Sequence, residues 1–342
     1  MSSAFVKSKL KSSRDAIKSE QWQQAEQDAK TVLEYEPDNY NAIVFRALAL
    51  LNLKQYEESE AAYRKAAEIQ PDTVLAWQGL EKFYNDRREP EKAAECARRQ
   101  ADIHLKADDA TKCAEALQRY IDTMVEEGGT AKRSEALQLW LPASPYYSLL
   151  SSLPAPNQST PKATTTFEAQ MAVHVNSLQI LEEVIGLEEA LEQNSIEKEV
   201  DRRKMRMDQA GKSRAKLVAE VGVEVWSHSK LPELYDQLLS HPRAGDEHRR
   251  TAESKLLAHK HRLLLALPNP SKSASASAGH AQAAAHDQAA TDKAKKSNDD
   301  ARKRKVELRD EVWKMAKGMV TIEVPDDLAW TIVLEWADHY SL

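Results

Sequence analysis

Glycine, cysteine and long apolar runs are all scarce in this chain of 342 residues. With only 9 glycines and few β-branched runs, the composition favours an all-α protein. The two cysteines, Cys96 and Cys113, lack ligand-like spacing and are expected to be reduced thiols of a cytoplasmic or nuclear protein. No stretch approaches 18 uninterrupted apolar residues and no apolar signal core follows Met1, so no membrane span is expected.

An excess of basic charge is also absent. The net charge is −6, with 30% charged residues and 6% aromatics, as expected of exposed helices. Direct nucleic-acid binding is therefore not expected. One basic run at residues 302–305 has acidic neighbours on both sides, such as Asp300 and Glu307. The alternative that this run addresses the nucleus or contacts RNA phosphates remains open.

The chain shows no motif for catalysis, a cofactor or a metal. Gly211, Lys212 and Ser213 resemble the end of a phosphate-binding loop, but Arg206 stands where that loop needs a glycine. The histidines at 259 and 261 point away from each other on a helix, which is expected to be solvated. We predict no catalytic, cofactor-binding or metal residues, and no enzyme.

What the chain does have is a sequence repeat with a fixed period. Pro37 and Pro71 lie about 34 residues apart, and small and aromatic residues recur in register between and after them. Ala47 and Ala93 fall where paired helices cross closely, and Tyr63 faces a neighbouring helix. This spacing is typical of tetratricopeptide (TPR) repeats, in which helix pairs stack to bury a shared core. An ordinary helical bundle is the alternative.

The sequence thus predicts an all-α TPR solenoid over residues 1–140, with three to four repeats of which the first and last are degenerate. The first helix of each repeat lines the concave face of such arrays. Co-chaperone domains grip a C-terminal carboxylate there with Lys and Asn, but Leu10, Arg14, Leu48 and Leu75 occupy those positions here. We expect instead a peptide or helical protein partner in a groove lined by Asn41, Val44, Leu48, Gln78, Lys82 and Asn85.

Four further segments follow the array. Residues 141–166 are rich in proline and predict an extended strap across the helices. Residues 167–267 predict long charged helices, the first running unbroken from Phe167 to about Ala210. Residues 268–300 are rich in Ala and Ser and predict a disordered insert. Residues 301–342 predict further helices, incomplete at the end, whose last helix carries an open apolar stripe of Leu328, Ile332, Trp336 and Tyr340.

The order of these segments resembles one known family. TPR repeats are followed by LWLP at residues 139–142, LP at 153–154, long charged helices, VP at 324–325 and LAW at 328–330. This order is similar to the N-terminal arm of the TPR subunit of the fungal superkiller complex. The resemblance covers most of the chain outside the Ala/Ser insert.

This resemblance implies a non-catalytic scaffold without cofactors. In that family the TPR subunit joins a DExH-box RNA helicase to WD40 propeller subunits, and the assembly feeds messenger RNA to the cytoplasmic exosome for 3′-to-5′ decay. The family's proteins are much longer, so the chain is expected to be a fragment. The alternative is a generic TPR adaptor that binds a peptide or helical partner and has no connection with RNA decay.

Overall fold

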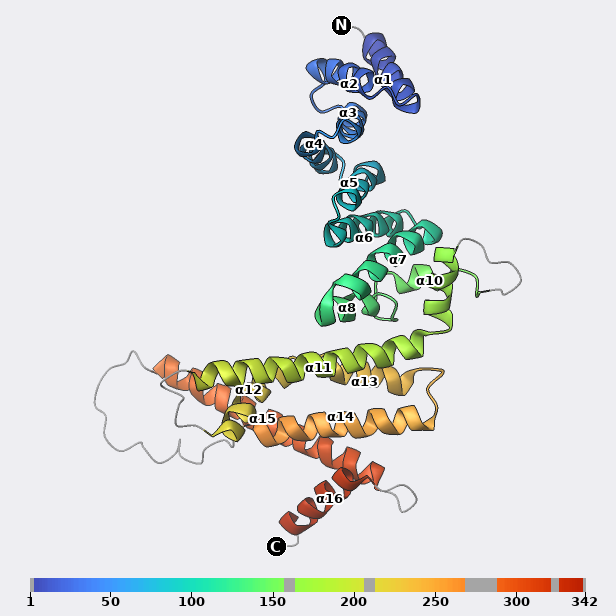
Figure 1. Cartoon of the computed structure of the whole chain (residues 1–342). Helices are drawn as coiled ribbons and strands as arrows, with labels where there is room; N and C mark the ends of the chain where they lie inside the picture. The colour runs from blue at the N-terminus through green and yellow to red at the C-terminus, as the bar shows by residue number, and fades with distance from the viewer. Residues whose placement is uncertain (1–2, 157–163, 206–212, 268–287, 321–325, 341–342) are drawn as a thin grey trace. The chain divides into compact units, whose positions relative to one another are not determined.

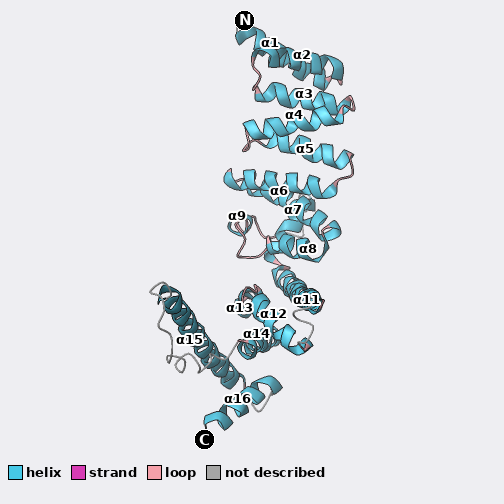
Figure 2. Ribbon diagram, turned by 90° about the vertical axis from the view of Figure 1, so that its left-hand side faces the viewer, coloured by secondary structure: helices cyan, strands magenta, loops and turns pink. Residues whose placement is uncertain are grey.

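The computed structural model describes residues 3–156, 164–205, 213–267, 288–320 and 326–340 (Figure 1). Within these ranges every regular element is a helix (Figure 2), which confirms the predicted all-α fold. The chain divides into two compact units, residues 1–180 and residues 181–342. No helix in the described ranges combines the length and apolar character needed to cross a membrane.

The first unit begins with four helix pairs stacked in sequence order (Figure 1). The third and fifth helices start at Tyr40 and Val74, which stand at the same position of successive repeats of about 34 residues. The poorly matching last repeat also forms a pair. The eight helices are α1 (Ser3–Lys18), α2 (Trp22–Tyr35), α3 (Tyr40–Asn52), α4 (Tyr56–Ile69), α5 (Val74–Asp86), α6 (Pro90–Lys106), α7 (Ala110–Glu127) and α8 (Gly129–Gln138).

Local chemistry explains where these helices begin and end. The Asn39 side chain accepts a hydrogen bond from the backbone N of Ala42 at 3.1 Å and so caps the start of α3. The turns between paired helices hold Glu20, Lys54 and Arg88 at positive φ (56°, 62° and 59°), at the same position of successive repeats. A left-handed residue after the last helical turn is a common way to end a helix.

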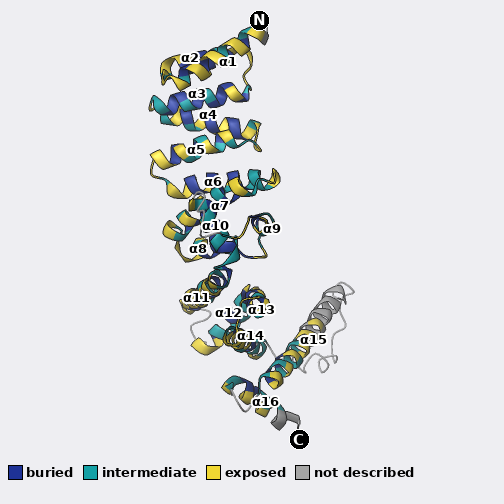
Figure 3. Cartoon of the chain, turned by 90° about the vertical axis from the view of Figure 1, so that its right-hand side faces the viewer, coloured by how far each residue is buried: buried dark blue, intermediate teal, exposed yellow. Residues whose placement is uncertain are grey.

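Small residues allow the paired helices to approach closely. Ala47 is fully buried, and the Ser59 hydroxyl of α4 donates to its carbonyl oxygen at 2.8 Å. A Cβ added at Gly79 of α5 would lie 2.1 Å from Cε1 of Tyr63, a buried residue of α4. The buried residues accordingly run along the inner faces of the helices (Figure 3). These joints set the spacing of the repeats.

Residues 139–156 differ from the predicted extended strap. Pro142 and Pro145 each occupy the second position of a tight turn, closed by bonds from Ser144 N to Leu141 O and from Tyr147 N to Ser144 O. Proline suits that position because its ring fixes φ near the required value. The short helix α9 (Tyr147–Leu150) follows the turns. The prediction of an extended conformation is therefore wrong for this part, and residues 157–163 lie outside the described ranges.

The predicted single helix from Phe167 to Ala210 is also interrupted. The structure has α10 (Thr164–His174) and α11 (Ser177–Lys204), with a break at Val175 and Asn176. The carbonyl oxygen of Asn176 accepts the first bond of α11, from Ile180 N. Asparagine favours this position at the start of a helix, which explains a break without proline or glycine. Residues 206–212 lie outside the described ranges.

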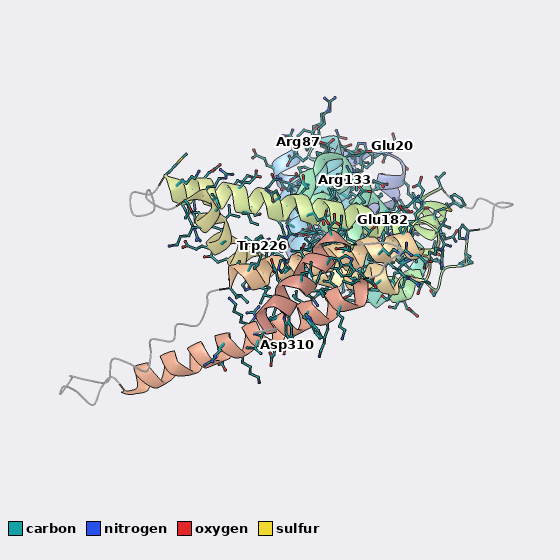
Figure 4. All side chains as sticks on the ribbon, turned by 90° about the horizontal axis from the view of Figure 1, so that it is seen from below. Glu20, Arg87, Arg133, Glu182, Trp226 and Asp310 are labelled. Carbon is teal, nitrogen blue, oxygen red and sulfur yellow. The ribbon has the colours of Figure 1, made fainter. Side chains whose placement is uncertain are left out.

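The second unit contains most of α11 and five further helices: α12 (Arg214–Trp226), α13 (Leu231–Ser240), α14 (Asp246–Ala266), α15 (Gln288–Met319) and α16 (Asp327–Tyr340). Trp226, labelled in Figure 4, lies at the end of α12, and the Arg262 guanidinium of α14 sits 5.7 Å from its ring centroid. Because α15 begins at Gln288, the predicted disorder is wrong for residues 288–300. Alanine and lysine are strong helix formers and explain this extension. Residues 268–287 lie outside the described ranges.

The apolar stripe of α16 is not an open face. Ile332 is buried in a core that also contains Leu257 of α14 and Val312 of α15, and Leu328 packs against it. The Trp336 ring stacks on that of Trp313, with centroids 4.8 Å apart. The predicted unfinished stacking face is therefore wrong for these residues, because the long α15 covers them. The side chain of Tyr340 lies outside the described residues.

Candidate protein-binding site

The six predicted groove residues fall into two groups. Asn41 of α3 and Gln78, Lys82 and Asn85 of α5 are exposed, and none of their side chains bonds to another described residue. Leu48 is half-buried. Val44 is only 8% exposed and packs inside the core. Val44 is therefore unavailable to a partner, because α3 is covered by neighbouring helices on more than one face.

A polar network fixes the helices beside this groove. The Arg119 guanidinium of α7 donates to Glu81 of α5 at 2.7 Å and to the side-chain oxygen of Gln100 at 3.2 Å. Gln100 of α6 is buried and donates to Glu81 at 2.5 Å. Sequence reasoning missed this network because its three members lie far apart in the chain. It holds α5, α6 and α7 together and leaves the exposed Lys82 ammonium outside its ion pairs.

A second cavity lies elsewhere on the first unit. It measures about 920 Å³ and lies between α4 and α6, with α5 as its floor. Trp77, Leu80 and Ile103 give it an apolar interior. The Trp77 indole N–H donates to the Pro71 carbonyl at 3.1 Å. None of the six predicted groove residues lines it, so this cavity is a second candidate site.

A cavity of about 430 Å³ between α2 and α4, with α3 as its floor, repeats the same design. Each of its lining residues has a counterpart one repeat later in the lining of the larger cavity. The pairs are Leu33 and Ala67, Pro37 and Pro71, Ile43 and Trp77, Arg46 and Leu80, Glu58 and Lys92, Ala61 and Glu95, Ala62 and Cys96, and Lys65 and Arg99.

One substitution explains why the two cavities differ. Arg46, on the floor of the smaller one, donates to Glu26 of α2 at 2.9 Å and lies 3.6 Å from Glu58 of α4. It thus bridges both walls. Leu80 holds the same repeat position in the larger cavity and is unable to form either ion pair. The floor of the second cavity therefore stays open and apolar, while charged side chains such as Arg64, Glu68 and Asp102 line its walls.

Burial shifts the pKa values of three side chains in the cores of the two units. Burial raises the pKa of the Cys96 and Cys113 thiols to about 12, so both stay protonated and unreactive at neutral pH. No cluster of three metal-ligating side chains occurs among the described residues. His259 is 2% exposed, so the predicted solvated helix is wrong at this position. Burial lowers the pKa of His259 to about 4.

The basic run at residues 302–305 is not a uniform patch. Arg302, Lys303 and Arg304 are exposed on α15. The Lys305 ammonium is half-buried and donates to the Leu267 carbonyl oxygen at 2.6 Å. Burial lowers the pKa of Lys305. Three exposed cations remain to carry any interaction with phosphates.

Comparison with known proteins supports the repeat assignment. Tetratricopeptide-repeat family models match residues 16–82 and residues 163–253. The second match covers α10, α11, α12 and α13, which the sequence analysis interpreted as charged helices without repeats. It was missed because the prolines and aromatic landmarks of the first array do not recur there at a fixed spacing.

Three relatives carry superkiller names. Superkiller protein 3 of Schizosaccharomyces pombe is 27% identical over 339 residues, which is 99% of this chain and 20% of that protein. Superkiller complex protein 3 of Homo sapiens is 50% identical over 84 residues, 25% of this chain and 5% of that protein. Superkiller complex protein 3 of Mus musculus is 49% identical, with the same coverage.

The stacked helix pairs and the repeat matches show that the fold is an all-α array of TPR repeats. Its sequence relationship to the superkiller protein 3 family extends over nearly the whole chain, which confirms the predicted resemblance. The chain spans about a fifth of the length of the fission-yeast relative, and the 84 residues that match the human relative span a twentieth of that protein.

Proposed function

We propose that the chain acts as a non-catalytic TPR scaffold in a superkiller-type complex. The observation that carries this proposal is the 27% identity to Superkiller protein 3 over 339 residues. A match of that length includes both units rather than a single generic repeat. The human relative is named as a protein of a superkiller complex and is 50% identical over 84 residues.

The finer part of the proposal follows from the family resemblance. The chain would contact a DExH-box RNA helicase and WD40 subunits and would assist the cytoplasmic exosome in 3′-to-5′ mRNA decay. It would work in the cytoplasm, with the nucleus as the alternative location. The fold is suited to this role because stacked helix pairs present extended surfaces to protein partners. The exposed Gln78, Lys82 and Asn85 are the proposed contacts.

Affinity purification of the tagged natural gene product, followed by mass spectrometry, tests this proposal. We expect the helicase and WD40 proteins to be recovered in comparable amounts. The triple variant Gln78→Ala, Lys82→Ala, Asn85→Ala should reduce their recovery several-fold. A matched control, Arg249→Ala with Glu253→Ala on exposed positions of α14, should leave recovery unchanged. Recovery of an exosome-unrelated partner in place of these proteins would contradict the proposal.

A generic TPR adaptor is the second candidate. The open cavity of about 920 Å³ favours it, because an apolar protein-binding site needs no RNA-decay partner. The two candidates differ in a cellular readout. Deletion of the gene should lengthen the half-lives of mRNAs that decay from the 3′ end if the scaffold proposal holds. An adaptor unconnected with RNA should leave those half-lives unchanged.

A further inference from the structure

Three grooves follow one another along the second helices of the repeats. The first lies between α2 and α4 and the second between α4 and α6. We call the equivalent face of α6, one repeat later, the third groove. The same repeat position carries an acidic residue in both helices, Glu68 on α4 and Asp102 on α6. Both line the second groove, and Asp102 also bonds to Tyr146. Arg64 and Arg98 are related in the same way. Because these positions are equivalent in successive repeats, the group that binds at one of them indicates the kind of group that the others accept.

The chain itself supplies the ligand of the third groove. Tyr146 is 2% exposed, and its hydroxyl donates a hydrogen bond to the Asp102 carboxylate of α6. Burial, together with the bond to this carboxylate, raises the pKa of Tyr146. Two turns started by proline present the ring, and Leu150 and Leu153, which follow it, are buried as well. A turn-forming segment, in which a tyrosine is followed by buried leucines, thus bonds to this face of α6 through the tyrosine hydroxyl.

The second groove has the same wall without an occupant from the described chain. Glu68 is exposed, and its carboxylate bonds to no described residue. The neighbouring Arg64 is held by Glu60 at 2.7 Å and by the Tyr84 hydroxyl at 3.0 Å. Leu80 keeps the floor apolar where Arg46 fills the first groove. The wall is therefore preorganised, and the acceptor is available to a ligand.

We propose that the second groove binds a short turn-forming peptide segment of a protein partner, containing a tyrosine followed by leucines. The tyrosine hydroxyl donates to Glu68 as that of Tyr146 donates to Asp102. The leucines cover Trp77, Leu80 and Ile103. This site lies apart from the groove of Gln78, Lys82 and Asn85, and it does not depend on membership of a superkiller complex.

A peptide binding assay on the full chain tests this inference. The probe is a fluorescent synthetic peptide with the sequence of residues 144–153, SPYYSLLSSL, because that segment occupies the equivalent wall. We expect saturable binding by fluorescence anisotropy. Glu68→Gln, and a probe with phenylalanine in place of its first tyrosine, should each weaken binding about tenfold through loss of a hydrogen bond to a charged acceptor. Lys82→Ala on the other groove is the matched control and should not change the affinity.

A second variant closes the groove. Leu80→Arg combined with Lys92→Glu recreates the bridge that Arg46 forms with Glu58, and Glu60 stands where Glu26 stands in the first groove. Binding should be lost while the helical circular dichroism signal is retained. If this double variant unfolds, the affinity of Glu68→Gln for the peptide still tests the proposal.

Two outcomes would overturn the inference. The first is no saturable binding up to about 1 mM peptide. The second is a loss of binding in Asp102→Asn but not in Glu68→Gln, which would mean that the probe only exchanges with the chain's own segment at the third groove.

Discussion

The described parts of both units are all-helical, but the helices within each unit pack through different kinds of contact. The first unit uses helices of 10 to 18 residues in its repeats, joined by Ala47, Gly79 and equivalent small residues. The second unit uses longer helices, such as α14 with 21 residues and α15 with 32. Both units bury polar groups: Gln100 in the first, and His259 in the second, where the Tyr235 hydroxyl also donates to Glu189 at 2.6 Å.

This difference shows two ways to specify a helical stack. In the repeats, one small set of contacts recurs, so each repeat reinforces the same geometry. In the second unit, single contacts such as the Tyr235–Glu189 bond occur once and fix one pair of helices. We therefore expect steric changes at the recurring joints to dominate the energetics of the first unit, and changes at single contacts to dominate those of the second. The following predictions test that contrast.

The largest effect is expected at Tyr63. Its ring is 2% exposed and fills the space beneath Gly79. Tyr63→Ala should lower the free energy of unfolding by about 3–5 kcal/mol, because it removes aromatic packing and leaves a cavity. Urea unfolding followed by circular dichroism measures the loss. A cost below about 1 kcal/mol would show that the joint is loosely packed.

The second unit should instead respond to pH through His259. Burial lowers the pKa of His259 from 6.5 to about 4, so the folded state disfavours the charged form. The unfolded chain then binds more protons, and stability is lost as pH falls from 6.5 to 4, by about 2–3 kcal/mol. Thermal unfolding between pH 7 and pH 4 should show this slope. His259→Leu should flatten it, and the exposed control His228→Gln should not.

The same substitution, glycine to alanine, is expected to change stability in opposite directions in the two units. Gly79→Ala should cost about 1–3 kcal/mol, because the new Cβ meets the buried Tyr63 ring at 2.1 Å and the ring has no room to move. Gly186 lies on α11, and a Cβ added there meets nothing within 4 Å. Gly186→Ala should stabilise the chain by about 0.5–1 kcal/mol. Thermal midpoints that shift in the same direction for both variants would contradict the expectation that a Cβ is excluded at Gly79 and tolerated at Gly186.

The smallest effect is expected at a helix cap. Asn39→Ala removes the 3.1 Å bond to Ala42 N and should cost about 1 kcal/mol. Gln23→Ala, on an exposed position of α2, is the control and should change stability little. Amide hydrogen exchange in the first turn of α3 should rise in Asn39→Ala only. Equal protection in both variants would show that the cap is not what holds this turn.

The sequence predicted the first unit well because its signals are local. Pro37 and Pro71 mark turns, and Ala47 marks a joint, so helix starts at Tyr40 and Val74 follow without tertiary information. The exposed residues of the predicted groove were harder to identify from the sequence. Exposure of Gln78 and Lys82 depends on which faces of a helix its neighbours cover, and the same reasoning placed the buried Val44 at the surface. Periodicity identifies an apolar face but not a second covered face.

The second unit was less predictable for physical reasons. The break at Val175 and Asn176 depends on a cap rather than on a helix breaker. Ile332 was expected to be open because a repeat array buries such a stripe under the following helix, whereas here the preceding helices α14 and α15 cover it. The cavities were missed because their walls come from helices of successive repeats. Long-range pairing of this kind leaves no mark in a single window of sequence.

The turns between paired helices contain three left-handed residues whose replacement is expected to raise the stability of the array. Glu20, Lys54 and Arg88 carry Cβ atoms in a conformation that glycine adopts without steric cost, and each is exposed. Replacing all three with glycine should relieve the same strain three times over. Since the sites belong to separate repeats, the gains should add. The array could thus be made more heat-resistant while every residue of its grooves is left untouched.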